Sequence, residues 1–206
     1  MPCSYVLLNR MIQIEFITAV IEKARNNDYS AQEQLIQMYQ KRIAGFVYAM
    51  VGSSMELEDI AQNIFIKMIM SLKGLKEYGQ FEPWLFRIAR NVCMDHLRKK
   101  KLRGIFTALL PIHSEIAESD NSLSDEALWI KKVLQDLPAK QRELLVLMQD
   151  REYTYEELSK ITGSTVSSVK SLLFRARETL SGRRDRELGK RGNAESGGEG
   201  IPAVTV

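Results

Sequence analysis

Apolar side chains return every three or four residues along most of this chain, which is the repeat of an α-helix buried on one side. The clearest stripe lies between Asp28 and Gly52 and contains, at spacings of 4, 4, 3 and 4, the residues Leu35, Tyr39, Ile43, Phe46 and Met50. No segment shows the convincing alternation of apolar and polar residues that a half-buried strand requires. The pattern therefore predicts an all-α protein.

Interruptions of this repeat divide the first half of the chain into four predicted helices. They cover residues 13–26, the segment between Asp28 and Gly52, residues 55–72 and residues 83–101, with a loop from Gly74 to Gly79 before the last helix. Pro83 suits a first helical turn, where a backbone N–H would find no acceptor within the helix. The inward residues of the third helix are predicted to be Ile60, Ile64 and Met68.

The second half of the chain predicts four more helices, at residues 125–136, 139–150, 155–161 and 166–181. Thr154 and Glu157 have the spacing of a capping box, in which each residue satisfies a free backbone N–H of the other. Gly163 marks a tight turn, and Thr165 is suited to cap the last helix. A short helix, a glycine turn and a longer basic helix form a helix-turn-helix pattern.

The composition changes between the two halves. Residues 113–126 contain five acidic residues and no Lys or Arg, with frequent Ser and Asn, which is typical of a solvated linker. We therefore expect two small helical domains, at 11–103 and 125–184, joined by a flexible acidic linker at 104–124. The second is a helix-turn-helix domain. The polar, glycine-rich residues 185–206 predict a disordered tail.

Composition excludes several classes of protein. The 206 residues are 45% apolar and 27% charged, an ordinary balance for a folded protein. No apolar run approaches the roughly 20 residues of a membrane span and no signal peptide is recognisable, so we expect a cytoplasmic protein that does not insert into membranes. The two Cys and two His residues lack metal-ligand spacing, and Cys93 is interpreted as a core residue. We expect no metal and no cofactor.

The net charge of +3 hides two basic segments. In the last predicted helix, 100° per residue places Val166, Val169, Leu173, Ala176 and Leu180 on the buried side. Ser171 and Arg175 then point away from the core, with Phe174 beside them and with Lys170 and Arg177 at the flanks. Such a face suits a DNA major groove, because Arg can donate two hydrogen bonds to guanine. A solvated basic helix is the alternative interpretation.

The second basic segment is the fourth predicted helix. Between Arg87 and Gly104, seven basic residues accompany one acidic residue. A stripe on the side of this helix opposite its inward residues contains Arg87, Asn91, Met94 and Arg98. Asn91 is a candidate base reader. Tyr78, in the preceding loop, could stack on an unpaired base. Trp84 and Phe86 are more simply explained as core residues.

These segments, in this order, resemble the extracytoplasmic-function group of bacterial RNA polymerase sigma factors, which belongs to the sigma-70 family. Residues 81–98 (FEPWLFRIARNVCMDHLR) are similar to the promoter-melting and minus-10 segment of that family. Residues 58–67 (EDIAQNIFIK) are similar to its polymerase-binding helix. Residues 137–143 (LPAKQRE) and 169–177 (VKSLLFRAR) are similar to its minus-35 domain. The resemblance extends over nearly all of residues 13–182.

The resemblance implies a transcription initiation factor rather than an enzyme. It would bind core RNA polymerase, through the beta-prime clamp helices and the beta subunit, and direct it to promoter DNA by reading minus-10 and minus-35 elements and promoting melting. The family often works under an anti-sigma factor, although nothing in this sequence identifies one. We find no catalytic constellation of residues in the sequence.

The resemblance also implies roles for individual residues. Asp59, Gln62 and Asn63 would bind the clamp helices, although Asn63 replaces an acid that is common there. The loop from Gly74 to Phe81, with Tyr78, would capture a flipped base together with Asn91, and Arg87 and Arg98 would hold the neighbouring backbone. The residues implied to read the minus-35 duplex are Lys170, Ser171, Phe174 and Arg175, with Arg177 on a phosphate. Leu172 stands where many relatives have a basic residue.

Two other classes of protein remain open from the sequence. A stand-alone helix-turn-helix regulator with an N-terminal oligomerisation domain would explain residues 154–180 but not the pattern at 81–98. An enzyme with a DNA-binding appendage, such as a nuclease, would need clustered carboxylates for a metal. Glu56, Glu58 and Asp59 are the nearest candidates, and they are equally typical of a solvated helix start.

Overall fold

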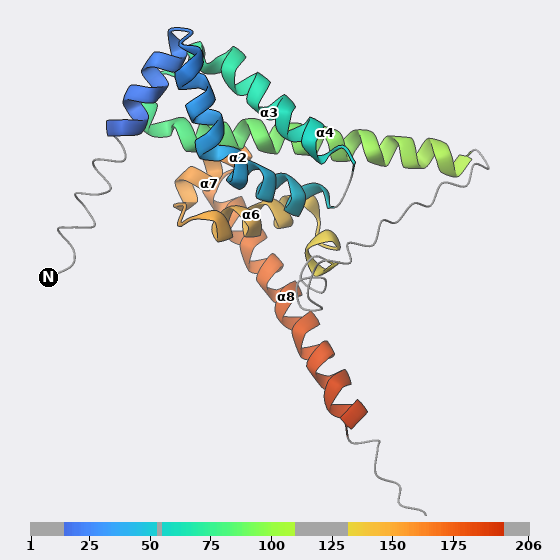
Figure 1. The fold of residues 1–206 in the computed structure, drawn as a ribbon. Coiled ribbons are helices and arrows are strands. Elements are labelled where there is room, and N and C mark those ends of the chain that lie inside the picture. Colours follow the sequence, from blue (N-terminus) through green and yellow to red (C-terminus); the bar gives the residue numbers. More distant parts are fainter. Residues whose placement is uncertain (1–14, 53–54, 110–131, 196–206) are drawn as a thin grey trace, which may run out of the picture.

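The computed structural model describes residues 15–52, 55–109 and 132–195, and all regular structure within them is helical (Figure 1), which confirms the all-α prediction. The N-terminal domain consists of a helix at residues 15–25, α2 (Tyr29–Val51), α3 (Leu57–Ser71), the short 3₁₀ helices η1 (Leu72–Gly74) and η2 (Tyr78–Gln80), and α4 (Phe81–Leu109). The C-terminal domain consists of α6 (Ala139–Asp150), α7 (Tyr155–Thr162) and α8 (Val166–Glu195). No described helix combines the length and apolarity needed to cross a bilayer.

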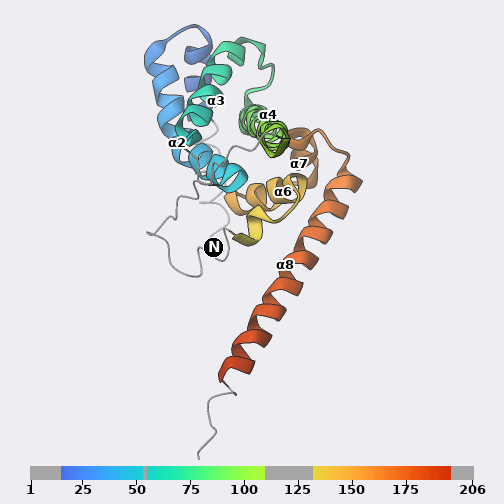
Figure 2. The ribbon, with the colours of Figure 1, turned by 90° about the vertical axis from the view of Figure 1, so that its right-hand side faces the viewer.

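Two helices are longer than the sequence pattern predicted. α4 begins at Phe81 rather than at Pro83 and continues to Leu109, into the predicted linker. α8 continues to Glu195, beyond its predicted end at residue 181 and into the segment predicted as a tail, and the end of α8 projects away from the other helices (Figures 1 and 2). Arg and Glu, which readily prolong a helix that is already formed, are frequent in the extension of α8, although this extension also contains three glycines.

Several other predictions concern residues outside the described ranges. These are the start of the first helix at 13–14, most of the linker at 110–124, the start of the next helix at 125–131 and the tail at 196–206. The domain boundaries therefore stay predictions.

Local hydrogen bonds explain where the helices of the helix-turn-helix begin and end. Thr154 and Glu157 form the predicted capping box of α7: the Thr154 hydroxyl accepts from the Glu157 N–H at 3.1 Å, and the Glu157 carboxylate accepts from the Thr154 N–H at 2.8 Å. α7 ends at Gly163, whose φ of 67° lies in the left-handed region that favours glycine. Thr165 caps α8 by accepting from the Ser168 N–H at 3.2 Å.

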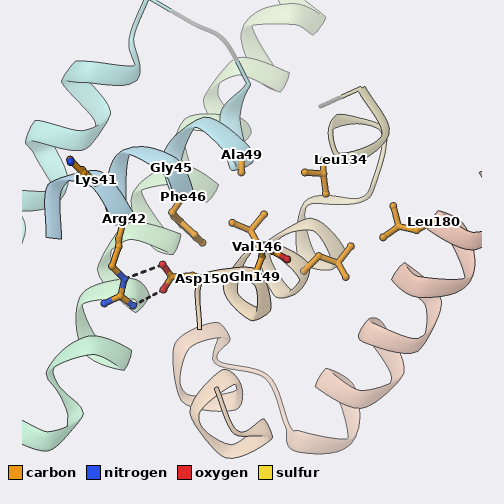
Figure 3. A pocket seen from close by; sticks show the side chains of 11 residues that line it. Lys41, Arg42, Gly45, Phe46, Ala49, Leu134, Val146, Gln149, Asp150 and Leu180 are labelled. Carbon is orange, nitrogen blue, oxygen red and sulfur yellow. Dashed lines mark hydrogen bonds and ion pairs between the residues drawn. The ribbon is translucent and has the colours of Figure 1, made fainter. Parts of the chain in front are cut away.

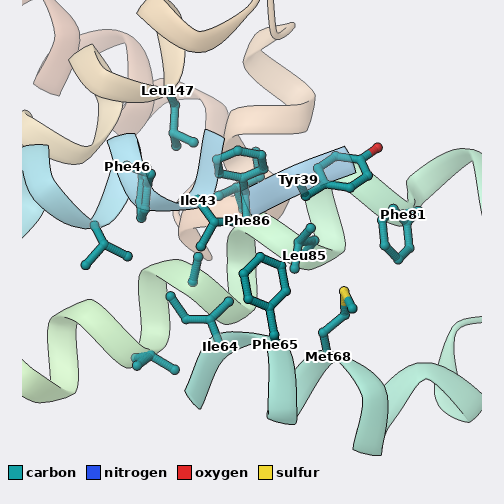
Figure 4. Packing of buried hydrophobic residues seen from close by; sticks show 14 of the residues in the cluster. Tyr39, Ile43, Phe46, Ile64, Phe65, Met68, Phe81, Leu85, Phe86 and Leu147 are labelled. Atoms are coloured by element: carbon teal, nitrogen blue, oxygen red, sulfur yellow. The ribbon is translucent and has the colours of Figure 1, made fainter. Parts of the chain in front are cut away.

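One continuous apolar core joins the two domains. The five residues of the α2 stripe are all buried, and they pack against Leu85 and Phe86 of α4 and against Phe65 of α3 (Figure 4). Leu144, Leu147 and Tyr153 of the C-terminal domain belong to the same cluster. The rings of Phe86 and Tyr153 meet edge to face with centroids 6.1 Å apart. The domains are therefore packed directly on each other.

An ion-pair network lies beside this shared core. Arg42 of α2 bridges Glu82 of its own domain at 2.8 Å and Asp150 of the C-terminal domain at 2.5 Å. Arg151 pairs with Glu82 across the interface and with Glu157 at 3.1 Å within its own domain. Arg42 and Asp150 also line one end of a largely apolar groove of about 670 Å³ between α2, α6 and α8 (Figure 3).

The C-terminal domain also buries two adjacent charges at the interface. Arg142 donates to the carbonyl of Met50, at the C-terminal end of α2, where the helix dipole favours a cation. Glu143 accepts from the Arg90 Nε at 3.0 Å and is only 1% exposed. Nearby, Gln135 approaches Gly52, where a Cβ would lie 3.2 Å from the Gln135 side chain and where φ is 83°. Glycine is therefore required at this end of α2 for two reasons.

The ion-pair network makes a prediction about acid stability. Burial would raise the pKa of Glu82, but hydrogen bonding and attraction from Arg42, with help from Arg151 and Tyr39, outweigh it and hold the pKa below its ordinary value of 4.5. The stabilisation is therefore complete above about pH 4.5 and is lost as the pH falls through the lowered pKa. Glu82→Gln should lower the free energy of unfolding at pH 7 and flatten its loss between about pH 5 and pH 3. Urea denaturation followed by circular dichroism measures both, and parallel pH curves for the two proteins would contradict the assignment.

Candidate nucleic-acid interface

The C-terminal domain presents a helix-turn-helix whose second helix carries the predicted minus-35 residues. Val169, Leu173 and Ala176 are buried as predicted, whereas Val166 and Leu180 are only partly buried. All five predicted reading residues are exposed, and they line one open groove of about 620 Å³: Lys170, Ser171, Phe174, Arg175 and Arg177. The fold therefore gathers residues that the sequence only placed on one side of a helix.

Tyr155 and Leu173 complete the lining of this groove. The Lys170 Nζ lies 5.2 Å from the centre of the Tyr155 ring, a cation–π contact that holds the amine beside the start of α7. Sequence reasoning used Tyr155 only as a member of the capping segment. The signal that could have identified it was the position of an aromatic residue directly after the N-cap of α7, the first helix of the helix-turn-helix.

The remaining groove residues have different local contacts. Phe174 is 63% exposed, an unusual position for a large aromatic ring. The Ser171 hydroxyl donates to the Ser167 carbonyl at 3.0 Å. Arg177 reaches back over α6 to the Met148 sulfur at 3.7 Å. Arg175 makes no side-chain hydrogen bond or ion pair with the described residues, so its guanidinium is available to a ligand.

The second candidate surface is the exposed face of α4. Arg87, Asn91 and Arg98 of the predicted stripe are all exposed, whereas Met94 is partly buried because it packs against the core. The Asn91 Oδ1 accepts from the Nη1 of Arg90 at 3.1 Å, and Arg98 pairs weakly with Asp95 at 3.4 Å. A short polar side chain and several guanidinium groups lie together on this face, and such groups form hydrogen bonds with bases and phosphates.

The aromatic residues before this face divide into core and surface. Phe86 is fully buried, as expected for a core residue, and Trp84 is partly buried against the same cluster. Tyr78, in η2, is half-buried, and its hydroxyl accepts from the Nη1 of Arg25 at 3.3 Å. The segment predicted as a loop from Gly74 thus contains a short 3₁₀ helix that holds the Tyr78 ring near the start of α4.

The third candidate surface lies on α3. Asp59, Gln62 and Asn63 are exposed, while Ile60, Ile64 and Met68 are buried as predicted. The same exposed side continues with two apolar residues that sequence reasoning did not use: Ile66, 56% exposed, and Met70, 79% exposed. Neither residue belongs to the inward stripe of this helix, and that was the sequence signal that could have identified them. A helix face of this kind, half apolar and half polar with one acidic group, suits a protein partner.

Catalytic and metal chemistry find little support among the described residues. No group of three or more His, Cys, Asp or Glu side chains there is arranged to hold a metal ion. Cys93 is buried, and burial raises the pKa of its thiol to about 12, so the thiol stays protonated at neutral pH. Burial lowers the pKa of His96, although Glu56 opposes the shift through a contact of 3.3 Å.

The three candidate surfaces lie on different helices, and two of them adjoin neighbouring elements. Asp59 and Asn63 share a polar groove of about 260 Å³ with Asp95, His96 and Lys99 of α4. The Lys160 Nζ of α7 donates to the Gln80 Oε1 of η2 at 3.0 Å. α7, which contributes Tyr155 to the groove on α8, thus packs directly on α4.

Comparison with known families and proteins gives a consistent result. Residues 35–103 match the family Sigma-70 region 2, and residues 127–180 match Sigma-70, region 4. The chain is 30% identical over 173 residues to the ECF RNA polymerase sigma factor SigW of Bacillus subtilis (strain 168), covering 78% of this chain and 92% of that protein. It is 29% identical over 174 residues to the RNA polymerase sigma-H factor of Pseudomonas aeruginosa, covering 78% and 90%.

Solved structures show the same fold. The structure of CnrH in complex with the cytosolic domain of CnrY matches with a TM-score of 0.63 at 21% identity, covering 82% of this chain and 97% of that one. The sigma factor RpoE of Bartonella quintana, in complex with the anti-sigma factor NepR, matches with a TM-score of 0.60 at 24% identity, covering 72% and 92%.

Proposed function

The chain belongs to the extracytoplasmic-function group of the sigma-70 family, and we propose that its two domains divide promoter recognition between them in the way described below. The protein is a transcription initiation factor that binds core RNA polymerase and directs it to promoters. A stand-alone helix-turn-helix regulator is not favoured, because residues 35–103 match region 2 of the family as well. The observation that carries the division of roles is the single groove formed by the five predicted minus-35 residues.

Transcription in vitro tests this function directly. Core RNA polymerase with and without the protein should be given genomic DNA, and the start sites should be mapped. We expect new starts that share two upstream sequence elements, one near minus-10 and one near minus-35. If the protein created no new starts, or starts without a shared element, it would not be a promoter-specificity factor.

In the minus-35 groove, the residues fall into base readers and phosphate contacts. Arg175 is exposed and makes no side-chain hydrogen bond or ion pair with the described residues, so its planar guanidinium can donate two hydrogen bonds to a guanine edge. Phe174 offers a ring to a thymine methyl group. Lys170 and Arg177 stand at the margins of the groove, where a sequence-independent contact to the DNA backbone is expected.

Substitution of the two arginines should separate these roles. Arg175→Ala should cost about 1–3 kcal/mol in binding to a minus-35 duplex and should relax the preference at one base pair. Arg177→Ala should weaken binding to all duplexes alike and reduce the salt slope by about one. Fluorescence anisotropy with a panel of single-base variants, at several salt concentrations, measures both effects. An equal, sequence-independent loss in both variants would show that the face of α8 has been assigned wrongly.

In the N-terminal domain, we assign base capture to Asn91 and the segment from η2 to α4. Asn91 is an exposed amide that can both donate to and accept from a base edge. Arg87 and Arg98 lie one turn or two turns away on the same exposed face and can hold the strand backbone. Tyr78 places a ring beside the start of α4, where an unpaired base could stack.

Asn91→Ala should impair melting while it spares binding of polymerase and of the minus-35 duplex. The loss should resemble one base contact, about 1–3 kcal/mol in open-complex formation. A template with a pre-opened bubble should recover part of the loss, because it removes the cost of unpairing but not the missing contact. Permanganate reactivity of thymines near the start site reports the melting on both templates. Normal reactivity of the variant on closed DNA would remove Asn91 from the melting mechanism.

On α3, we assign polymerase binding to the exposed side that carries Asp59, Gln62 and Asn63. Ile66 and Met70 extend this side by two further turns, so the polar contacts are followed by an apolar patch. Asn63 carries no charge, which leaves Asp59 as the principal acidic group among the three. The partner surface is the clamp helices of the beta-prime subunit.

Charge reversal at Asp59 should weaken polymerase binding without harming the fold, since the residue is exposed. Asp59→Lys should reduce co-purification with core polymerase at least tenfold, the size of effect expected from placing a like charge in a complementary interface. Glu33→Lys, on the exposed side of α2, is a matched charge reversal and should have no effect. Circular dichroism should be unchanged for both. Undiminished polymerase binding by Asp59→Lys would exclude this helix side from the interface.

Three further features complete the proposal. The protein contributes sequence recognition and no covalent catalysis, since the sequence offers no catalytic constellation. Its place of action is the cytoplasm, where RNA polymerase works. An anti-sigma factor is included among its partners because RpoE of Bartonella quintana, which shares its fold, was solved in complex with the anti-sigma factor NepR.

A further inference from the structure

Basic residues recur every seven positions along the whole length of α8. The recurrence begins with the two proposed phosphate contacts of the minus-35 groove and consists of Lys170, Arg177, Arg184 and Arg191. Seven residues at 100° each make two turns less 20°, so these positions fall within about 60° of one another around the helix. They therefore form a single line, which is called the basic line of α8 below.

Only the first half of the basic line lies in the part of α8 that matches the family. The match to Sigma-70, region 4 ends at residue 180, whereas α8 continues to Glu195. Arg184 and Arg191 belong to this extension, which projects away from the other helices (Figure 2). Membership of the family therefore assigns no role to the second half of the line.

Net charge alone does not explain the pattern. Residues 184–195 contain four basic and three acidic residues, so the extension as a whole is nearly neutral. Among the acidic residues of α8, only Glu195, the last residue of the helix, falls on the basic line. The feature that distinguishes the line is thus the placement of the positive charges and not their number.

The start of the extension is fixed to the C-terminal domain. The Arg183 Nη1 donates to the Asp136 Oδ2 at 2.6 Å. Leu180, one turn earlier, is partly buried and lines the groove between α2, α6 and α8. Position 183 lies about 100° from position 184 around the helix, so the ion pair with Asp136 does not use the basic line. The packing of the domain therefore sets the direction in which the extension leaves it.

A duplex read by the first part of α8 would lie within reach of the next residue on the basic line. Lys170 and Arg177 are about 10 Å apart along the helix axis, a span that fits a major groove about 12 Å wide. Arg184 is about 10 Å farther along the axis, which takes it past the edge of the groove to the phosphate backbone. The C-terminal end of a homeodomain recognition helix contacts the DNA backbone in the same way.

We propose that α8 is an extended recognition helix whose basic line continues the backbone contacts of Lys170 and Arg177 into the duplex beside the minus-35 element, with Arg184 as the principal new contact. The proposal rests on the proposed reading of the minus-35 duplex by α8. Because the partner is a phosphate, the contact adds affinity and no sequence preference. Arg191 contributes less, since it lies about 10 Å farther out, more than the Debye length of about 8 Å at physiological salt.

The test uses the full-length protein and duplexes that carry the minus-35 element found by mapping start sites. One duplex extends about ten base pairs beyond the element on both sides, about 34 Å each. Two shorter duplexes each lack one of these flanks. Arg184→Ala removes the proposed contact. Arg186→Ala is the matched control, because it removes the same charge from the same helix at a position on the opposite side from the basic line.

Arg184→Ala should weaken binding to the fully flanked duplex by about three- to tenfold, the effect of one exposed hydrogen bond to a charged group. It should also reduce the slope of log K against log salt by about 0.9, one phosphate contact on a duplex. The loss should be equal for all flanking sequences and should vanish on one of the two shorter duplexes, because one helix end reaches one flank. Arg191→Ala should cause a smaller loss, and Arg186→Ala should bind like the wild type. Fluorescence anisotropy measures all of these.

Four results would overturn the proposal. Equal losses in Arg184→Ala and Arg186→Ala would show that overall charge, and not the basic line, attracts DNA. A loss that persisted on both shorter duplexes would place Arg184 within the element. Unchanged DNA binding with weaker co-purification of core polymerase would make the extension a protein contact, and no change in either would make it a solvated helix.

The wild type separates these failures from a failure of the proposed function. Its preference for the duplex with the minus-35 element over a scrambled duplex is measured in the same titrations. Loss of that preference would show that α8 does not read the element at all. A preserved preference with an inactive Arg184 would refute only the extended contact.

Discussion

The burial of Glu143 is the constraint on which the arrangement of the two domains depends. A carboxylate this deeply enclosed needs a cationic partner, and the partner in the structure is Arg90 of the other domain. The neighbouring Arg142 is also buried, and it reaches the last turn of α2 through the Met50 carbonyl. Two consecutive charged residues of α6 are thus satisfied in part by the N-terminal domain, which fixes how α6 and α7 sit on α2 and α4.

This constraint connects packing with DNA recognition. Each proposed reading surface is small: a groove on α8 and one side of α4. Two weak readers on one chain bind strongly only when their separation matches that of the two DNA elements. The packed domains do not have that separation, so a partner that holds them apart determines whether the readers act together. In this arrangement specificity depends on assembly with polymerase, as well as on contacts to bases.

The sequence predicted the local structure well because local rules govern it. Helical periodicity found α6 with the bounds observed, and the capping box of Thr154 and Glu157 is present as predicted. The exposed residues of α8 were identified from 100° per residue alone. Helix ends were less predictable: α4 and α8 continue beyond their predicted ends, through Gly104 in α4 and through Gly189 and Gly192 in α8, because a glycine weakens a helix that is already formed but does not end it.

The contacts between domains could not be read from the sequence. Arg42, Glu82 and Asp150 look like ordinary surface charges along the chain, and the pairs that Arg42 forms with Glu82 and Asp150 join residues 40 and 108 positions apart. Tyr155, Ile66 and Met70 were also missed, since their importance depends on which neighbours leave them exposed. Periodicity describes one helix at a time, whereas these features arise from the way several helices pack.

The conclusion that the packed domains must separate to read a promoter can be tested directly. The test measures the distance between the two domains in the free protein and in the complete polymerase on promoter DNA. Fluorophores attached through Tyr29→Cys and Glu178→Cys, both at exposed positions, with Cys3→Ser to remove the other reactive thiol, allow single-molecule energy transfer. We predict one high-transfer population in the free protein and a shift to low transfer in the complex, as the domains approach the roughly 85 Å between the two elements. Equal transfer in both states would contradict the conclusion that the packed domains must separate to read a promoter.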